Sequence, residues 1–187
     1  MSAAIDWAAL EAAAPRYAVV VAEAGLAFPR SAARSFDVVD RAQGTATTDF
    51  GAPDRTTDAD LRGLGRAGAS RLAELVAASW RVLADVAAGA PPELRKGPRG
   101  GGRDRDAIVQ HVIGADAAYA RRLGLRQQVP DPGDEAGVGA LRRSILDALR
   151  TAPSAEPLAE KGWAPRYAAR RLAWHALNHA WEIEDRS

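Results

Sequence analysis

The sequence predicts a mainly α-helical protein, built as a four-helix bundle with a small N-terminal α/β appendage. Two observations indicate the bundle. From about residue 58 onward, apolar side chains recur every three or four positions in four successive segments, which is the spacing of one face of an α-helix. Proline, glycine and aspartate separate these segments, as is typical of helix ends. We therefore divide the chain into an appendage, residues 1–57, and a bundle, residues 58–187.

The appendage has a mixed pattern. The segment DWAALEAAAPRYAVVVAEAGL is helical in character but is interrupted by Pro15, and a proline inside a helix removes a backbone hydrogen bond. The segment SFDVVDR, from Ser35 to Arg41, has the apolar residues of a short strand, Phe36 and Val38 among them. A broken helix followed by a strand predicts a small α/β unit.

The first bundle helix is expected from about Asp58 to Ala88. Its front end is expected to be irregular, because three glycines lie between residues 63 and 68 and glycine disfavours helix. A second helix begins after Asp104 or Asp106, since either carboxylate can accept from the free amides of the first turn. It ends at Gly124, a residue typical of helix C-termini.

The third helix is expected from about Asp134 to Thr151, with its apolar residues at helical spacing. The fourth begins near Pro165 and continues to the end of the sequence. Proline suits the first position of a helix, because the N–H that it lacks has no partner there.

Composition excludes several classes of function. The formal net charge is +1, which argues against a general nucleic-acid binder. The sequence has no cysteine, so disulfides, thiolate ligands and a cysteine nucleophile are excluded, and any metal must be held by imidazole or oxygen. No apolar run approaches the roughly 20 residues of a membrane span, and the N-terminus lacks the basic start of a signal peptide. We therefore expect a cytoplasmic protein without a membrane or nucleic-acid partner.

The three histidines of the chain are the candidate metal ligands. His175 and His179 are four residues apart on the fourth predicted helix, which makes them neighbours on one helical face. His111 on the second helix is the only further histidine, so we expect all three to meet at one divalent ion. Spacing alone leaves a plainer interpretation open, because H-x-x-x-H arises by chance and a core histidine is more often a hydrogen-bonded packing residue.

Other polar residues are expected to support these ligands. A metal-bound histidine usually donates its second ring N–H to a carboxylate or carbonyl, and Arg171, Asn178 and Glu182 lie close to the histidine face of the helix. Glu182 is also a candidate direct ligand. Three protein ligands with an open position are typical of a catalytic rather than a structural site. Asp116, five residues after His111, is expected to point away as a surface or capping charge.

A basic, glycine-rich loop, ELRKGPRGGGRDRD, leads directly into the helix of His111. Backbone amides of such a loop and of a helix N-terminus favour anions. The loop therefore predicts a substrate-binding clamp for a carboxylate or phosphate, with Lys96, Arg99 and Arg103 as its side chains. The alternative is a solvated basic loop without a ligand.

The strings DAIVQHVIGADAAYARRLG and RRLAWHALNHAWEIEDR resemble the DinB/YfiT-like superfamily of metal-dependent proteins, over roughly residues 58–187. The resemblance implies a DinB-type four-helix bundle. It also implies a zinc- or nickel-like divalent ion, held by one histidine of the second helix and the H-x-x-x-H pair of the last, which here are His111, His175 and His179. A homodimer is implied as well, and the first 57 residues are similar to part of a HicB-type module.

The resemblance further implies an enzyme that acts on a small-molecule substrate. Several members of the superfamily transfer a low-molecular-weight thiol, such as bacillithiol or mycothiol, to an electrophile. Because the chain has no cysteine, such a thiol would be a cosubstrate. The sequence leaves two alternatives to this S-transferase open: a metal-dependent hydrolase, and a non-catalytic bundle that binds metal or acts through a partner.

Overall fold

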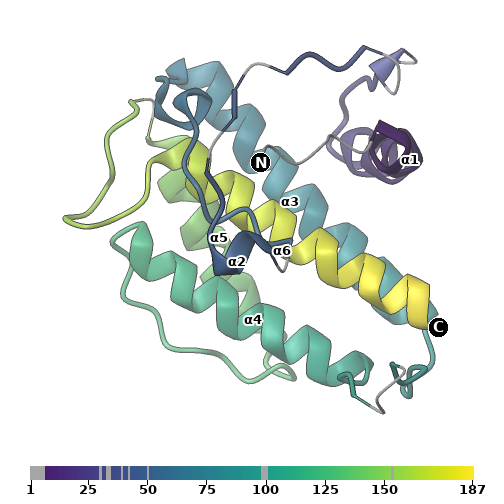
Figure 1. Ribbon diagram of the computed structural model, residues 1–187. Helices are drawn as coiled ribbons and strands as arrows, with labels where there is room; N and C mark the ends of the chain where they lie inside the picture. Colours follow the sequence, from purple (N-terminus) through teal and green to yellow (C-terminus); the bar gives the residue numbers. More distant parts are fainter. Residues whose placement is uncertain are drawn as a thin grey trace.

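The computed structural model of the chain describes residues 7–29, 31–32, 35–38, 40–41, 43–49, 51–97, 101–152 and 154–187. The described residues are mainly helical, and four long helices follow one another from residue 65 onward (Figure 1). The elements in chain order are α1 (Trp7–Glu23), α2 (Ala46–Asp49), the 3₁₀ helix η2 (Asp58–Leu61), α3 (Gly65–Gly89), α4 (Arg105–Arg122), α5 (Glu135–Arg150) and α6 (Pro165–Arg186).

The four long helices close into a bundle in which each packs against two neighbours. Helix α3 lies against α6 and α5, and α4 lies against the same two helices from the other side. Helices α3 and α6 run in parallel, since Arg166 near the start of α6 donates to the carbonyl of Arg62, while the amide of Arg95 donates to the carbonyl of Arg186. Helix α4 runs the opposite way, because the amide of Trp163 donates to the carbonyl of Arg122 at its end.

Helix α5 is antiparallel to α3 and therefore parallel to α4. Arg150 at its end pairs with Glu74 early in α3, whereas Arg142 lies over the ring of Trp80 further along α3. Because α4 and α5 point the same way, the connection between them has to return along the bundle (Figure 1). This arrangement places α4 directly beside α6 and leaves the connection on the far side.

The predicted starts of α5 and α6 and the predicted end of α4 are confirmed. Asp104 is the N-cap residue of α4, but its carboxylate does not cap the helix and accepts instead from the amide of Leu94 and from Lys96. Asp134 caps α5, with its Oδ1 accepting from the amide of Gly137 at 2.9 Å. Pro165 occupies the first turn of α6, and Gly124 follows α4 with a left-handed φ of 80°. The expected irregular front end of the first bundle helix is the 3₁₀ turn η2, after which α3 begins at Gly65.

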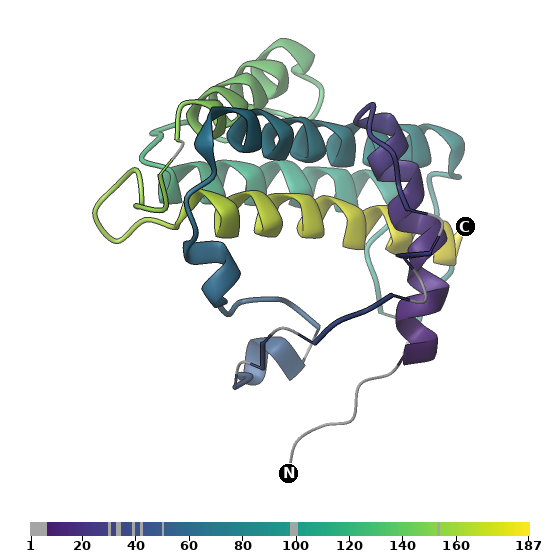
Figure 2. The same ribbon diagram turned by 90° about the horizontal axis from the view of Figure 1, so that it is seen from above.

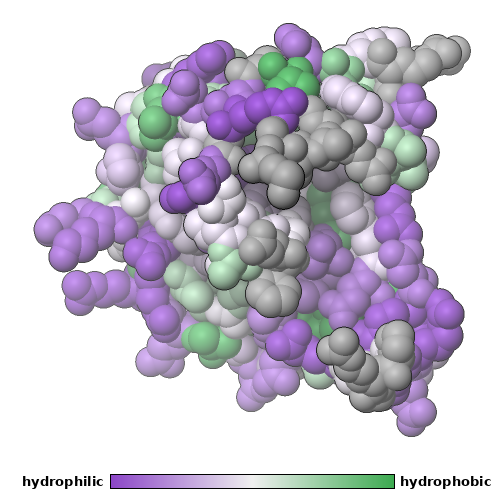
Figure 3. Space-filling view, viewed as in Figure 1, coloured by the Kyte–Doolittle hydropathy of each residue, from purple (hydrophilic) through white to green (hydrophobic). Residues whose placement is uncertain are grey.

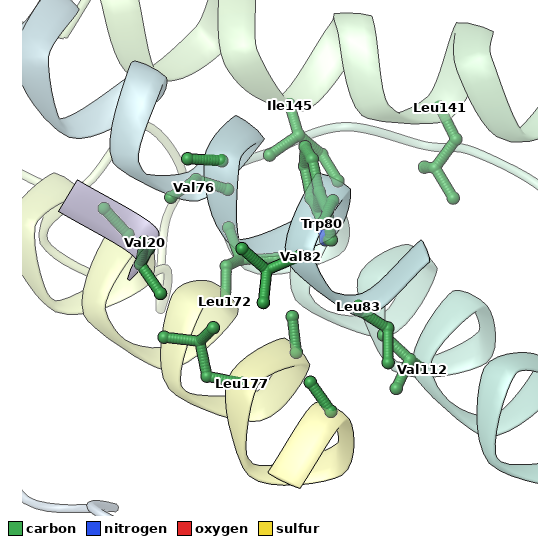
Figure 4. Packing of buried hydrophobic residues seen from close by; sticks show 14 of the residues in the cluster. Val20, Val76, Trp80, Val82, Leu83, Val112, Leu141, Ile145, Leu172 and Leu177 are labelled. Carbon is green, nitrogen blue, oxygen red and sulfur yellow. The ribbon is translucent and has the colours of Figure 1, made fainter. Parts of the chain in front are cut away.

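Apolar side chains from all four bundle helices form one core (Figure 4). Trp80, Leu83, Ile145 and Leu172 are each at most 4% exposed. Burial of such a side chain stabilises the fold by about 1.5–3 kcal/mol. Much of the remaining core is alanine, which lets helix backbones approach closely, and these fully buried alanines are Ala73, Ala78, Ala117, Ala120, Ala176 and Ala180.

Helix α1 is continuous through Pro15, so the predicted interruption is wrong. The helix crosses the end of the bundle near the C-terminus (Figure 2). Its Val20 is buried in the core, the ring of Tyr17 lies edge-on to Trp181 at 5.2 Å, and Arg16 pairs with Asp185. These contacts stabilise a helix that proline weakens, because tertiary packing outweighs local propensity.

The predicted strand between Ser35 and Arg41 is not seen. The described residues of this segment, 35–38 and 40–41, have no regular secondary structure, and residue 39 lies outside the described part. Phe36 instead stacks on Trp7 of α1, with ring centroids 6.1 Å apart. A strand needs a neighbouring strand to pair with, and the described residues include no strand. The α/β character expected for the appendage is therefore not supported.

Asp116 is a buried residue, so the prediction of a surface or capping charge is wrong. Only 1% of it is exposed. It accepts from the indole Nε1 of Trp80 at 3.2 Å and from the Nε of Arg142 at 3.3 Å, and so links α3, α4 and α5. It does point away from the histidines, as expected. Burial raises the pKa of this carboxyl to about 6, although the charge of Arg142 opposes the shift.

The face of the molecule seen in Figure 3 is largely hydrophilic, with only scattered hydrophobic residues. Among the described residues, no helix is both long and apolar enough to span a membrane.

We predict that replacing Pro15 by alanine slows the local opening of α1. Alanine restores an N–H donor inside the helix, and residue 15 is exposed, so no packing is lost. The free energy of opening should rise by about 1–3 kcal/mol. Amide hydrogen exchange along α1 measures the change, with the amides of α5 as an internal reference. Unchanged exchange in α1 would show that the proline does not limit this helix.

Asp116 should make the protein less stable as pH rises. Between its unfolded pKa of 3.8 and its folded pKa of about 6, the unfolded chain loses the proton while the folded chain keeps it. The free energy of unfolding of the wild type, relative to Asp116→Asn, should therefore fall by about 2–3 kcal/mol between pH 4 and pH 6.5. Denaturant titrations at each pH measure this difference. A difference that is constant across the range would contradict the buried, partly protonated carboxyl.

Candidate metal centre

The three histidines lie together where α4 packs against α6. Each offers one ring nitrogen to a cluster in which all three atoms are within 4.8 Å of one another. The ring centroids of His111 and His175 are 5.1 Å apart, those of His111 and His179 are 4.9 Å apart, and those of His175 and His179 are 4.7 Å apart. The antiparallel packing of α4 on α6 thus brings His111 to the pair that helical spacing already placed on one face.

Burial differs among the three rings. His175 and His179 are each 7% exposed, whereas His111 is partly exposed. The face of α4 that carries His111 continues through Gly114 and Ala115, which are also partly exposed and have small side chains. A Cβ built on Gly114 would meet no atom within 4 Å. The cluster is therefore closed on the side of α6 and open beside α4.

His179 is oriented by a carboxylate. Its Nδ1 lies 2.8 Å from Oε2 of Glu182, one turn further along α6. The other carboxylate oxygen accepts from NH1 of Arg186 at 2.7 Å, and the Nε of Arg186 donates to the carbonyl of Arg95 at 2.8 Å. This chain of bonds leaves the Nε2 of His179 for a ligand, in the arrangement that metal-binding histidines commonly have.

The glycine-rich loop closes against the same arginine. Gly102 has a φ of 121°, and a Cβ there would come within 2.6 Å of NH2 of Arg186. A side chain at this position would displace the guanidinium that holds Glu182. Glycine is therefore required at position 102 because the guanidinium of Arg186 lies against its backbone. The sequence alone did not indicate this contact.

The electrostatics keep two of the rings neutral. Burial, together with the neighbouring rings and Arg171, lowers the pKa of His175 to about 3. Burial, Arg103 and His179 also lower the pKa of His111. A neutral imidazole has a lone pair to donate, and a protonated one has none. Both rings are therefore in the ligand form at neutral pH.

The residues fit a divalent ion. Three imidazoles without thiolates suit Zn²⁺ or Ni²⁺. Nitrogens of a tetrahedral zinc site lie ~3.4 Å from one another when each is ~2.1 Å from the ion. The histidine nitrogens lie within 4.8 Å of one another, so the cluster would contract by at most about 1.4 Å on binding the ion. His175 has a buried Nδ1 without a hydrogen-bond partner among the described residues. A buried nitrogen of this kind is costly when it is left unpaired, which favours a ligand at this ring.

An aromatic and cationic layer surrounds His175. The ring of Tyr119 from α4 lies edge-on to it at 5.6 Å, and Trp174 lies beside it at 6.0 Å. Arg171, one turn before His175, donates to the hydroxyl of Tyr119 at 3.4 Å. The rings exclude water from one side of the cluster, and the guanidinium adds positive charge there.

The remaining residues predicted for the site lie in different surroundings. Glu182 is bonded to a histidine, as expected, whereas Asn178 is exposed and its side chain forms no hydrogen bond with the described residues. Lys96 forms an exposed ion pair with Asp104 at 2.5 Å. Arg103 is exposed and its charge acts on His111 and His175. Arg99 lies outside the described residues.

The comparisons add no relative to this description. No family model matches the chain, and neither the curated proteins nor the solved structures contain a match to it. The likeness to DinB-type proteins therefore rests on the two sequence strings alone.

We predict that Glu182→Gln weakens binding of Zn²⁺ by about tenfold or more, because loss of the carboxylate charge makes His179 a poorer donor. Competition with a chromophoric chelator measures the affinity. The matched control is Glu184→Gln, which alters an exposed glutamate of the same helix that pairs with Arg16 at 3.7 Å. Equal affinities of the two variants would contradict the role of Glu182.

Proposed function

We propose that this protein is a DinB-like, metal-dependent S-transferase, which joins a low-molecular-weight thiol to a small electrophile. One observation carries the proposal: three histidines from α4 and α6 converge on a point that is closed by aromatic side chains on one side and open on the other. Three imidazole ligands and an open position are typical of catalytic zinc sites.

The residues have separate tasks in such a reaction. His111, His175 and His179 would hold Zn²⁺ or Ni²⁺, and Glu182 orients His179. When bound, the ion would act as a Lewis acid that lowers the pKa of a thiol or a water molecule beside it. The thiol loses its proton to solvent, its sulfur forms a bond to the electrophilic carbon, and the leaving group departs with the bonding electrons.

The hydrogen bonds of the site favour a thiol over water as the nucleophile. A metal-dependent hydrolase often uses a free carboxylate as the base that takes the proton of water. Glu182 is the carboxylate bonded to the cluster, and both of its oxygens are already engaged, by His179 and by Arg186. Because the chain has no cysteine, the nucleophilic sulfur has to come from a second substrate. The hydrolase remains the second candidate function.

Metal content tests the proposal directly. Purified wild-type protein, prepared without chelator, should contain about one divalent ion per chain, and His175→Ala should lose it. Asn178→Ala is the matched control, because it changes an exposed residue of the same helix and should retain the metal. Elemental analysis gives the stoichiometry. Folded wild-type protein that neither contains nor takes up Zn²⁺ or Ni²⁺ would overturn the proposal.

A conjugation assay then separates the two enzyme classes. Metal-loaded protein is incubated with an electrophile, with and without a low-molecular-weight thiol. The transferase predicts a thioether product that depends on the thiol, and the hydrolase predicts turnover without it. Loss of both in His175→Ala, with Asn178→Ala unaffected, would assign the activity to the histidine centre.

A further inference from the structure

Arg171 is a buried cation without a counter-ion. Only 9% of this residue is exposed, and its Nε and NH1 have no hydrogen-bond partner among the described residues. Its NH2 donates to the hydroxyl of Tyr119 at the long distance of 3.4 Å. The guanidinium lies over two rings, 5.7 Å from the centroid of Tyr119 and 5.1 Å from that of Trp174.

Other buried charges in the described part of the chain are paired. Asp60 binds Arg170 at 2.5 Å, and Asp116 binds Arg142 at 3.3 Å. Arg171 takes part in no ion pair there. Guanidinium stays protonated at any physiological pH, so burying it without an anion costs several kcal/mol. Stacking on aromatic rings offsets part of this cost.

Positive charge exceeds negative charge around the histidines. Arg103 acts on His111 and His175 from the exposed side. The negative charge of Glu182 is balanced by Arg186, with which it pairs at 2.7 Å. The site is therefore cationic before any metal binds, and a divalent ion would increase the imbalance.

Tyr119 contacts both the guanidinium of Arg171 and a surface cavity. Its ring lies between His175, at 5.6 Å, and Trp163, at 5.1 Å. The same tyrosine lines a surface cavity of about 480 Å³, whose charged lining is three cations and one carboxylate, Arg121, Arg122, Lys161 and Glu160. The hydroxyl that accepts from Arg171 still has its own proton to donate. An anion beside Tyr119 would gain this hydrogen bond and lie close to the guanidinium.

We propose that the histidine centre binds a small molecule that carries an oxyanion, a carboxylate or a phosphate, recognised by Arg171 and Tyr119, with its body in the cavity beside Trp163. The proposal rests on the proposed function and deepens it, since Tyr119 packs against His175, with ring centroids 5.6 Å apart. It assigns the anion to the inner face of the bundle, whereas the glycine-rich loop was the place that the sequence predicted.

Calorimetric titration of chelator-treated, metal-free protein tests the proposal, with benzoate and inorganic phosphate as probes at constant ionic strength. At least one probe should bind the wild type with a stoichiometry of about one, and Arg171→Met should weaken it by at least about tenfold. Arg171→Lys keeps the charge and should lose less affinity than Arg171→Met. Arg143→Met is the matched control, because it removes an exposed positive charge on α5; its affinity should equal that of the wild type.

Thermal unfolding distinguishes this role from a structural one. If Arg171 serves to bind an anion, its buried charge is uncompensated in the free protein. Without probe, Arg171→Met should then unfold at the same temperature as the wild type or at a higher one, because the substitution removes that charge. In the wild type the bound probe should raise the unfolding temperature. A structural role predicts the opposite, a lower unfolding temperature for Arg171→Met with unchanged probe affinity, and would overturn the proposal.

Two further outcomes separate this proposal from that of the metal centre. Failure of both probes to bind the wild type, metal-free or loaded with Zn²⁺, would refute the anion site. Elemental analysis of protein purified without chelator reports the metal independently, and Arg171→Met should retain it because Arg171 is not a candidate ligand. Anion binding by a protein that neither contains nor takes up Zn²⁺ or Ni²⁺ would refute the transferase alone, and metal uptake without anion binding would refute the anion site alone.

Discussion

The antiparallel contact between α4 and α6 is the constraint on which the candidate site depends. Helical spacing places His175 beside His179. The ring of His111 lies against this pair because α4 packs antiparallel to α6. Fully buried alanines on both helices, Ala117 and Ala176 among them, keep the two backbones close. Larger side chains there would separate the helices, and the rings of three residues could then no longer share one ligand.

The positions of the four bundle helices follow from local signals in the sequence. Pro165 and Asp134 are start signals that act within one helical turn, and apolar spacing defines the inward faces. The H-x-x-x-H pair is local in the same sense, so the ligand pair on α6 could be predicted. That His111 joins the pair could be proposed only because no other histidine exists in the chain.

The wrong predictions concern residues whose state is set by partners far along the chain. Asp116 is buried because Trp80 and Arg142, 36 and 26 residues away, satisfy its carboxylate. Pro15 sits inside a helix because α1 docks on the bundle through residues such as Val20. Phe36 has the β propensity that a strand needs, but a strand also needs a neighbour, and this residue stacks on Trp7 instead.

The glycine-rich loop illustrates how a motif can serve a site without touching the ligand. Lys96 is held by Asp104, while Gly102 gives room to Arg186, which in turn fixes Glu182 against His179. The loop thus helps to orient His179, a candidate metal ligand. In our proposal, recognition of an anion falls to Arg171, a residue on the inner face of α6 that belongs to no sequence motif. Two aromatic rings cover its guanidinium and limit its contact with water, and electrostatic attraction is strongest where water is excluded. A cationic, half-closed centre of this kind favours a thiolate over a thiol and an anionic electrophile over a neutral one, so the same charge would serve both substrates.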